Sequence, residues 1–373
     1  MTGIDDYLRG FGEESGYLDY GRVGPLAGVV QAEIRSQLDL LGRARYGAID
    51  QLRGQDERMR NAVAALLGFP ADNIVSQPNT SMGLMHTMFG ITGSVLLSAG
   101  DFPSLTVAAA RASESMQVLT PTWLETDHGR VTPHTIREQL TPSITAVAVS
   151  LVDTRTGYLA DLDGIRQVIG DRLLIVDAIQ GLGVVDAPFE VADVVASGGQ
   201  KWLRSGWGTG FLALSDRALE HLEPVVSGYT GTDEPEPWDS VPPPSKTARA
   251  YSVANPDFSA AGRLAAALEE IAAAGIGNIS AAVADRVGEA LSLADEFAIG
   301  VVSPRAEHER AGIVILDPAE DQVALLSASL HNHGVTTTIR QNRIRLSVHA
   351  GTTSETLGML RDSFVSFSTA VAY

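Results

Sequence analysis

Short apolar runs rich in β-branched residues alternate with helix-like stretches through the first two thirds of the chain. The strand candidates are 73–77, 94–98, 117–124, 144–152, 172–178, 192–196 and 209–214. The helix-like stretches between them are 53–68, 81–90, 103–115, 160–170 and 216–223. Strands that are hydrophobic along their whole length and separated by helices predict a parallel sheet covered on both faces. Ligands of such sheets bind beyond the carboxyl ends of the strands.

The pattern changes at residues 229–246, where proline, glycine and acidic residues preclude regular structure. The elements predicted after this segment are helices at about 258–274 and 278–297, strands near 312–316 and 335–347, and a helix from 353. We therefore expect an α/β fold with two domains. The large domain, 26–256, holds a mostly parallel seven-stranded sheet, and 1–25 joins 257–373 in a smaller α+β domain.

Composition narrows the class of protein. Of the 373 residues 45% are hydrophobic and 19% charged, which is enough material for a core. The net charge of −18 argues against nucleic acid as a partner, because binding phosphates needs clustered Lys and Arg. The acidic N-terminal segment has no signal sequence and no apolar run is long enough to span a membrane, so a cytoplasmic protein is expected.

Two residue types bear on metal and sulfur chemistry. Cysteine is absent, which excludes disulfides, thiolate metal sites and a cysteine nucleophile. The eight histidines show no metal-ligand spacing, and His331 and His333 are expected on the surface at a helix end. No metal is therefore expected.

Lys201 is the first candidate for chemistry. It follows a predicted buried strand, and three glycines trail it before the next strand. An ammonium group so close to a sheet core is costly unless it is paired, neutralised or covalently engaged. A desolvated lysine with a lowered pKa is what Schiff-base chemistry requires. Taken alone, a lysine that extends from a loop to solvent is the favoured explanation.

Asp177 ends the preceding apolar strand, and Gln180 follows three residues later. A carboxylate there can hold a pyridinium nitrogen protonated, and the Gln180 amide can donate to the phenolic oxygen of such a ring. The alternative is an aspartate that starts a turn after a strand. Because Asp177 and Lys201 lie at the ends of adjacent predicted strands, both can face one crevice, and together they outweigh the alternative.

A third segment lies between the first predicted strand and its helix. Asn79, Thr80 and Ser81 offer hydroxyl groups and free N–H groups there, which together form an anion site. The alternative is an ordinary N-cap. The segment is compatible with a phosphate cradle.

These three segments, in this order and at these separations, resemble class V pyridoxal-phosphate enzymes such as cysteine desulfurases, kynureninases and isopenicillin-epimerase-like proteins. The resemblance runs from about Leu18 to the end of the chain. It implies the fold type I of pyridoxal phosphate-dependent transferases, with Lys201 carrying pyridoxal 5'-phosphate and Asp177 facing its ring nitrogen. It also implies a homodimer with shared active sites that acts on a small-molecule amino acid.

The resemblance extends to further residues. Thr80 and Ser81 match the threonine that binds the cofactor phosphate, and Phe102 in DFPS is similar to the aromatic that stacks on the pyridine ring. Asp153 in LVDTRTG stands where asparagine is usual, near the phenolic oxygen of the cofactor. Asn255 in SVANPDF matches a segment that reaches into the neighbouring subunit's site.

Two more segments are assigned to the substrate. The segment 17–26 looks like an opening strand that lines the substrate mouth, and Arg345 in RIRLSVHAGTT matches the arginine that clamps the substrate carboxylate. A guanidinium binds a carboxylate through two parallel hydrogen bonds, which fixes the orientation of an amino acid. The alternative is a surface arginine on an edge strand, a role that suits Arg340 and Arg343 better.

The lysine segment departs from the family pattern at two cofactor-binding positions. Gln200 precedes the lysine where His, Tyr or Arg is common. The hydroxyl residue usually found three places before the lysine is replaced by Gly198, and Ser197 stands one place earlier. Either Ser197 or the Gly198 main chain is left for that phosphate contact.

The type of reaction is predicted by excluding two family reactions and by resemblance to a third. A persulfide-forming desulfurase is excluded because no cysteine can receive the sulfur, and a true kynureninase lacks support because tyrosines do not flank Lys201. Several segments are similar to those of C–S lyases of ergothioneine biosynthesis, which cleave hercynylcysteine sulfoxide. We expect β-elimination from a cysteine S-conjugate or sulfoxide. Transamination, a kynureninase-like or epimerase-like reaction and a catalytically silent binding module stay open.

Overall fold

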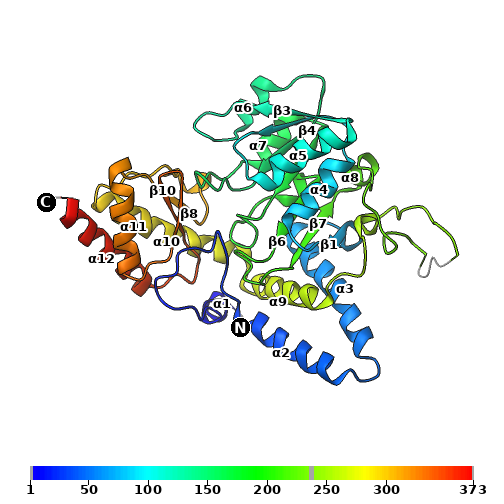
Figure 1. Ribbon diagram of the computed structural model, residues 1–373, viewed down its shortest axis with the longest axis horizontal. Coiled ribbons are helices and arrows are strands. Elements are labelled where there is room, and N and C mark those ends of the chain that lie inside the picture. The colour runs from blue at the N-terminus through cyan, green and yellow to red at the C-terminus, as the bar shows by residue number, and fades with distance from the viewer. Residues whose placement is uncertain (1–2, 235–238, 372–373) are drawn as a thin grey trace.

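The central sheet has the strand order β1-β7-β6-β5-β4-β2-β3 in the computed structural model, which describes residues 3–234 and 239–371 (Figure 1). Its strands are β1 Ile74–Ser76, β2 Gly93–Ser98, β3 Leu119–Leu124, β4 Ile144–Ser150, β5 Leu173–Asp177, β6 Val194–Gly198 and β7 Gly210–Leu214. Neighbours from β3 to β6 pair in parallel, whereas β7 is antiparallel to β1 and β6. The mostly parallel seven-stranded sheet predicted from the sequence is confirmed.

Helices cover both faces of this sheet. Along β5, Leu174 and Val176 pack into one apolar cluster and Ile175 packs into another, because side chains alternate across a strand. The second cluster includes residues of α4 Thr80–Gly90, α5 Pro103–Met116 and α8 Asp216–His221. The first includes residues of α3 Ala48–Leu67, α6 Pro133–Gln139, α7 Leu162–Ile169 and α9 Phe258–Ala274. Burial on both faces explains why the strands are apolar throughout.

A second, antiparallel sheet of order β8-β10-β9 follows later in the chain. Its strands are β8 Ile313–Leu316, β9 Thr338–Arg340 and β10 Arg343–Ser347. The helices α10 Ile276–Glu296, α11 Val323–Asn332 and α12 Ser354–Val371 lie beside it, apart from the large sheet (Figure 1). The segment after the N-terminal helix α1 Ile4–Arg9 reaches it too, since Asp19 bridges to Ser347.

The helix α9 lies against α3 and α2 Gly28–Arg43, beneath the large sheet in Figure 1. The division into 26–256 and a smaller domain stays a prediction. Short 3-10 turns complete the chain: η1 Ala71–Asn73, η2 Phe189–Val191, η3 Ala248–Tyr251, η4 Glu307–Glu309 and η5 Glu320–Gln322. Among the described residues no single helix is long and apolar enough to cross a membrane, and the pair α9 and α10 passes that test only as two helices bent by 83°.

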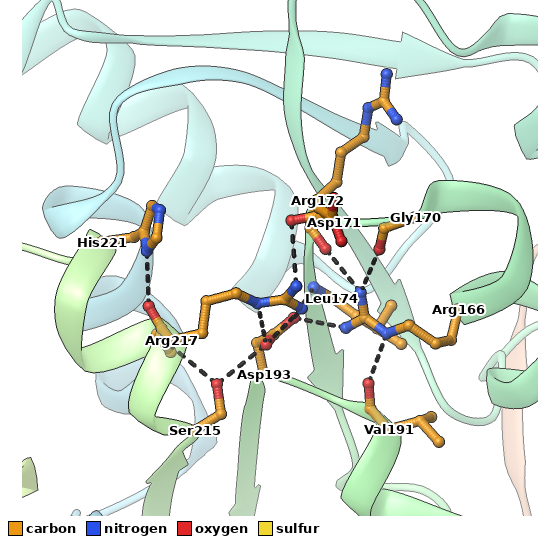
Figure 2. A network of polar contacts seen from close by, with 11 residues as sticks. Arg166, Gly170, Asp171, Arg172, Leu174, Val191, Asp193, Ser215, Arg217 and His221 are labelled. Atoms are coloured by element: carbon orange, nitrogen blue, oxygen red, sulfur yellow. Dashed lines mark hydrogen bonds and ion pairs between the residues drawn. The ribbon is translucent and has the colours of Figure 1, made fainter.

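Asp193 is the centre of a polar network at the amino end of β6 (Figure 2). Its carboxylate accepts hydrogen bonds from Arg166, Arg217, Ser215 and the Leu174 main chain. Burial by itself would raise the pKa of this carboxyl, but the hydrogen bonds from Arg217 and Leu174 and the charge of Arg166 hold it below its usual value. The network ties α7 and α8 to the sheet, at the edge opposite to the carboxyl ends of the parallel strands.

We expect Asp193→Asn to lower the free energy of unfolding by about 3 kcal/mol, the low end for a truncated buried ion pair, because both arginines are partly exposed. Since folding lowers the pKa of this carboxyl, its stabilisation is present above its unfolded pKa and is lost as the pH falls. Urea unfolding of wild type and variant at pH 7 and at acid pH measures both effects. Asp50→Asn is the control, since Asp50 is 81% exposed and lies 3.8 Å from Arg53.

Candidate active site

Most of the predicted site residues follow strands that run in the same direction. β1 leads into Thr80, β2 into Phe102, β4 into Asp153 and β6 into Lys201, and β5 ends at Asp177. These strands are parallel to one another, so their carboxyl ends meet at one edge of the sheet. This edge is where α/β proteins bind their ligands.

Lys201 is buried at this edge, with 9% of its surface exposed. Its Nζ lies 5.3 Å from the centroid of the Phe102 ring. Burial lowers the pKa of Lys201 to about 8; the charge of Asp177 opposes this shift, whereas Arg345 and Arg340 add to it. A larger share of the amine is therefore neutral near pH 7 than for an exposed lysine, as a nucleophile or base requires.

Asp177 pairs in register with Ala196 of β6 and is 2% exposed. Its Oδ1 accepts a hydrogen bond from the Ile179 main chain at 3.1 Å, whereas its Oδ2 is buried without a hydrogen-bond partner in the described part of the protein. Burial raises its pKa to about 6, against the opposing effects of the Ile179 hydrogen bond and the Lys201 charge. A buried oxygen without a donor fits a ligand that brings its own N–H group.

Thr80 stands at the first position of α4, after the N-cap Asn79. Its Oγ1 is buried and has no partner among the residues in the structure, and a Cβ placed on Gly198 would lie 3.3 Å from it. The hydroxyl thus faces the end of β6 across a gap that a glycine leaves open. A helix N-terminus with a free hydroxyl suits a phosphate group.

The other hydroxyl and amide candidates near this end lie differently. Ser81 is exposed and its Oγ lies 2.7 Å from Ser104 Oγ. Ser197 is fully buried and its Oγ donates to the Gly198 carbonyl at 3.3 Å. Gln200 is half-buried, and its Oε1 lies beside Gly198, where a Cβ would overlap it. Their contacts to a phosphate stay predictions.

Gln180 and Asp153 are engaged within the protein. The Gln180 amide donates to the Gly21 carbonyl at 3.0 Å and accepts from Trp202 Nε1 at 2.9 Å. Asp153 Oδ1 accepts from the main chains of Arg155 and Thr156 at 2.8 Å each and from the Thr156 hydroxyl at 2.9 Å. Asp153 therefore shapes its own loop, whereas Gln180 links the segment 17–26 to Trp202. The sequence indicated neither role, and the contacts of both side chains to a cofactor stay predictions.

Arg345 lies on β10 and is 4% exposed. Its Nη1 donates to Thr154 Oγ1 at 2.9 Å and its Nη2 to Asp19 Oδ1 at 3.2 Å, while its buried Nε has no partner in the described residues. Burial lowers its pKa, although the charge of Asp19 opposes this. Asp19, in the segment 17–26, thus places a carboxylate beside the predicted substrate clamp. Sequence reasoning missed this contact.

Asn255 is not brought to Lys201. It is exposed and lines surface hollows with Ser252 and Asp257 on one side and with Arg249 and Phe258 on the other. Its predicted reach into a neighbouring subunit stays a prediction.

Asp101 was also missed by sequence reasoning, although it directly precedes Phe102. It is buried beside Ser150, and its Oδ2 has no hydrogen-bond partner in the parts of the chain that the structure describes. Burial raises its pKa to about 7; a hydrogen bond with Ser150 opposes this, and the charges of Asp153 and Asp177 add to it. The signal available in the sequence was its position, three residues after a predicted strand.

These observations together test whether pyridoxal phosphate fits. Within the described residues, the buried Oδ2 of Asp177 lacks a donor and the Thr80 hydroxyl lacks a partner. Lys201 follows β6, which lies between β1 and β5 in the sheet, and its Nζ is next to the Phe102 ring. A ring N–H, a phosphate and an aldehyde are the groups that would satisfy these three positions. The residues fit this cofactor.

Comparison with known sequences agrees with this geometry. The sequence model of aminotransferase class-V matches residues 39–370. A kynureninase from Deinococcus radiodurans is 27% identical over 275 residues, which cover 69% of this chain and 65% of that protein. The soluble hydrogenase 42 kDa subunit of Anabaena cylindrica is 39% identical over 82 residues, 21% of each chain. The matches thus span less than two thirds of the length of these curated relatives.

Solved structures show the same fold at lower identity. A cysteine desulfurase from Thermococcus onnurineus NA1 has a TM-score of 0.83 and 19% identity, with 93% of this chain and 94% of that chain covered. The cystine C–S lyase C-DES, in complex with its product cysteine persulfide, has a TM-score of 0.83 and 18% identity, with 94% and 97% covered. These likenesses confirm the predicted fold type I. With its matched sequence, its fold and a site that fits the cofactor, the chain belongs to the class-V aminotransferase family of pyridoxal phosphate-dependent enzymes.

Proposed function

We propose that the protein cleaves the C–S bond of a cysteine S-conjugate or its sulfoxide by β-elimination. With one water, an S-conjugate yields pyruvate, ammonia and a thiol, and a sulfoxide yields the corresponding sulfenic acid. The observation that carries the proposal is the buried Lys201, whose pKa is lowered, within the influence of the Asp177 charge in a chain without cysteine. Asp177 Oδ2 has no hydrogen-bond partner in the described residues.

Lys201, Asp177 and Arg345 have separate roles in the proposed reaction. When bound, pyridoxal phosphate supplies an attachment point for the substrate amino group and an electron sink for the Cα carbanion. Lys201, neutral in part near pH 7, takes the Cα proton and can pass it on to the departing sulfur. Asp177 Oδ2 holds a proton on the ring nitrogen, and Arg345 orients the substrate carboxylate.

The absence of cysteine favours elimination over sulfur transfer to the protein. Desulfuration through a protein-bound persulfide needs a thiol, and the sequence has none. Loss of a β-sulfur substituent needs only proton removal and a leaving group. The likeness to the C–S lyase C-DES supports this reaction type, whereas the kynureninase relative keeps a kynureninase-like reaction as the second candidate.

Incubation of the holoenzyme with an S-conjugate and no keto acid tests the reaction. Sustained release of pyruvate over many turnovers is expected. A single turnover that restarts only when a keto acid is added would identify a transaminase and overturn the proposal. Kynurenine in the same assay, with anthranilate as the readout, tests the second candidate.

We also propose that two copies form a homodimer with shared sites. Asn255 is surrounded by exposed apolar side chains, among them Val226, Tyr229 and Val253. An obligate interface of roughly 2,000 Å² or more would cover such a surface. Full activity of a monomer at nanomolar concentration, judged by mass photometry and pyruvate release, would contradict the homodimer.

We also propose that the protein is located in the cytoplasm, and cell fractionation tests this location.

A further inference from the structure

A cavity of about 420 Å³ lies between the loop that follows β2 and the hairpin of β9 and β10. Its polar lining includes Asp101 and four arginines: Arg155, Arg340, Arg343 and Arg345. Phe102 forms part of its wall, and the same ring lies 5.3 Å from Lys201 Nζ. The cavity therefore adjoins the reaction site, and it gathers positive charge in a chain whose net charge is −18.

Two of the four arginines donate hydrogen bonds to carboxylates. Arg345 donates to Asp19 Oδ1 at 3.2 Å, and Arg343 Nε donates to Asp317 Oδ1 at 2.9 Å. In these pairs most of the positive charge is balanced within the protein. Arg343 is therefore a poor candidate for binding a further anion in the cavity, and Arg345 is the residue proposed for the α-carboxylate of the substrate.

The side chains of Arg155 and Arg340 donate no hydrogen bond to a carboxylate in the described residues, so both can bind a further anion. Arg155 Nε forms a long ion pair with Asp153 Oδ2 at 3.8 Å, beyond hydrogen-bonding distance, and it has no hydrogen-bond partner among the described residues. Arg340 forms no ion pair within the described parts of the chain, and its guanidinium carbon lies 6.0 Å from the Phe102 ring centroid. Both side chains thus line one cavity and have guanidinium N–H groups left for a ligand.

The cavity wall leaves room for the Arg155 side chain at Gly100. The Arg155 guanidinium lies against this glycine, and a Cβ there would overlap Nη2. Asp101 is the carboxyl group in the lining that would repel an anion, and burial raises its pKa to about 7. Its negative charge is therefore reduced at and below neutral pH.

We propose that Arg155 and Arg340 bind a second anionic group of the substrate, so that the preferred substrate is an amino acid whose sulfur-borne group carries a carboxylate or a comparable acid. Paired guanidinium groups bind such acids through charge-assisted hydrogen bonds. The proposal rests on the proposed C–S lyase function for the position of the sulfur, whereas binding of the acid needs no turnover.

The test compares S-(2-carboxyethyl)-L-cysteine with its uncharged isostere S-(2-carbamoylethyl)-L-cysteine. Affinity is measured on the holoenzyme from the change of its visible absorption, and turnover from pyruvate release. We expect wild type to bind the acid about tenfold more tightly than the amide, as for hydrogen bonds to a charged group. Arg155→Gln and Arg340→Gln should bring this ratio near unity and leave affinity for the amide unchanged.

Arg343→Gln is the matched control, because Arg343 lines the same cavity but is paired with Asp317. It should keep the preference for the acid. Equal binding of acid and amide by wild type, no binding of either, or an equal loss of preference in all three variants would overturn the anion site. Preferential binding of the acid without pyruvate release would instead refute the lyase function and leave the anion site standing.

Discussion

Lys201→Ala is expected to lower the rate of pyruvate release by about 10⁴-fold, the upper end of what a single general base contributes. Lys201 is buried beside Phe102 and its pKa is lowered to about 8, whereas the only other lysine in the chain, Lys246, is exposed. Its removal takes away both the proposed attachment of the cofactor and the proposed base. The fold should persist, because Lys201 makes no side-chain hydrogen bond within the described residues.

Two measurements separate attachment from catalysis. Borohydride reduction followed by peptide mapping should find the pyridoxyl label on Lys201 in the wild type. Lys246→Ala is the control and should keep both label and rate. Because the pKa of Lys201 is lowered, the neutral amine becomes the main form as the pH rises through about 8, so cofactor uptake by the cofactor-free protein should quicken over that range. A label on Lys246 would refute the assignment.

Arg345→Ala is expected to weaken amino-acid binding by about 2–5 kcal/mol, the range for a buried charge pair truncated on one side. Affinity is read from the visible absorption of the holoenzyme, whose cofactor colour should be unchanged. Unfolding in urea must be measured alongside, because Asp19 is 2% exposed and loses its partner in this variant. Arg345→Lys keeps a charge for Asp19 but loses the planar fork, so it should restore stability more than affinity.

Arg343→Ala is the control for Arg345, since Arg343 lies on the same strand and pairs with Asp317 at a partly exposed position. It should leave amino-acid binding unchanged. Unchanged affinity in Arg345→Ala would mean that another arginine, such as Arg22 or Arg155, holds the α-carboxylate.

The strands were predictable because both faces of the sheet are buried. The apolar run 172–178 contains β5 Leu173–Asp177, and 209–214 contains β7 Gly210–Leu214. The antiparallel direction of β7 was not readable, because strand direction depends on the path of the connection and not on the run itself. The helix α2 was missed since, in its 16 residues, only Val30 and Gln37 are buried, which leaves no clear apolar stripe.

The positions of Lys201 and Asp177 at strand ends could be predicted from the sequence alone. Asp177 ends one buried apolar run and Lys201 follows shortly after another, and the absence of cysteine excludes a protein-bound persulfide without any structure. The surroundings of Arg345, in contrast, become visible only in the folded chain. Asp19 meets Arg345 across 326 positions of the chain, and the cavity joins the loop after β2 to a hairpin of another sheet. The hydrophobic periodicity of a single helix or strand does not reveal such contacts. They depend on how elements far apart in the sequence pack against one another.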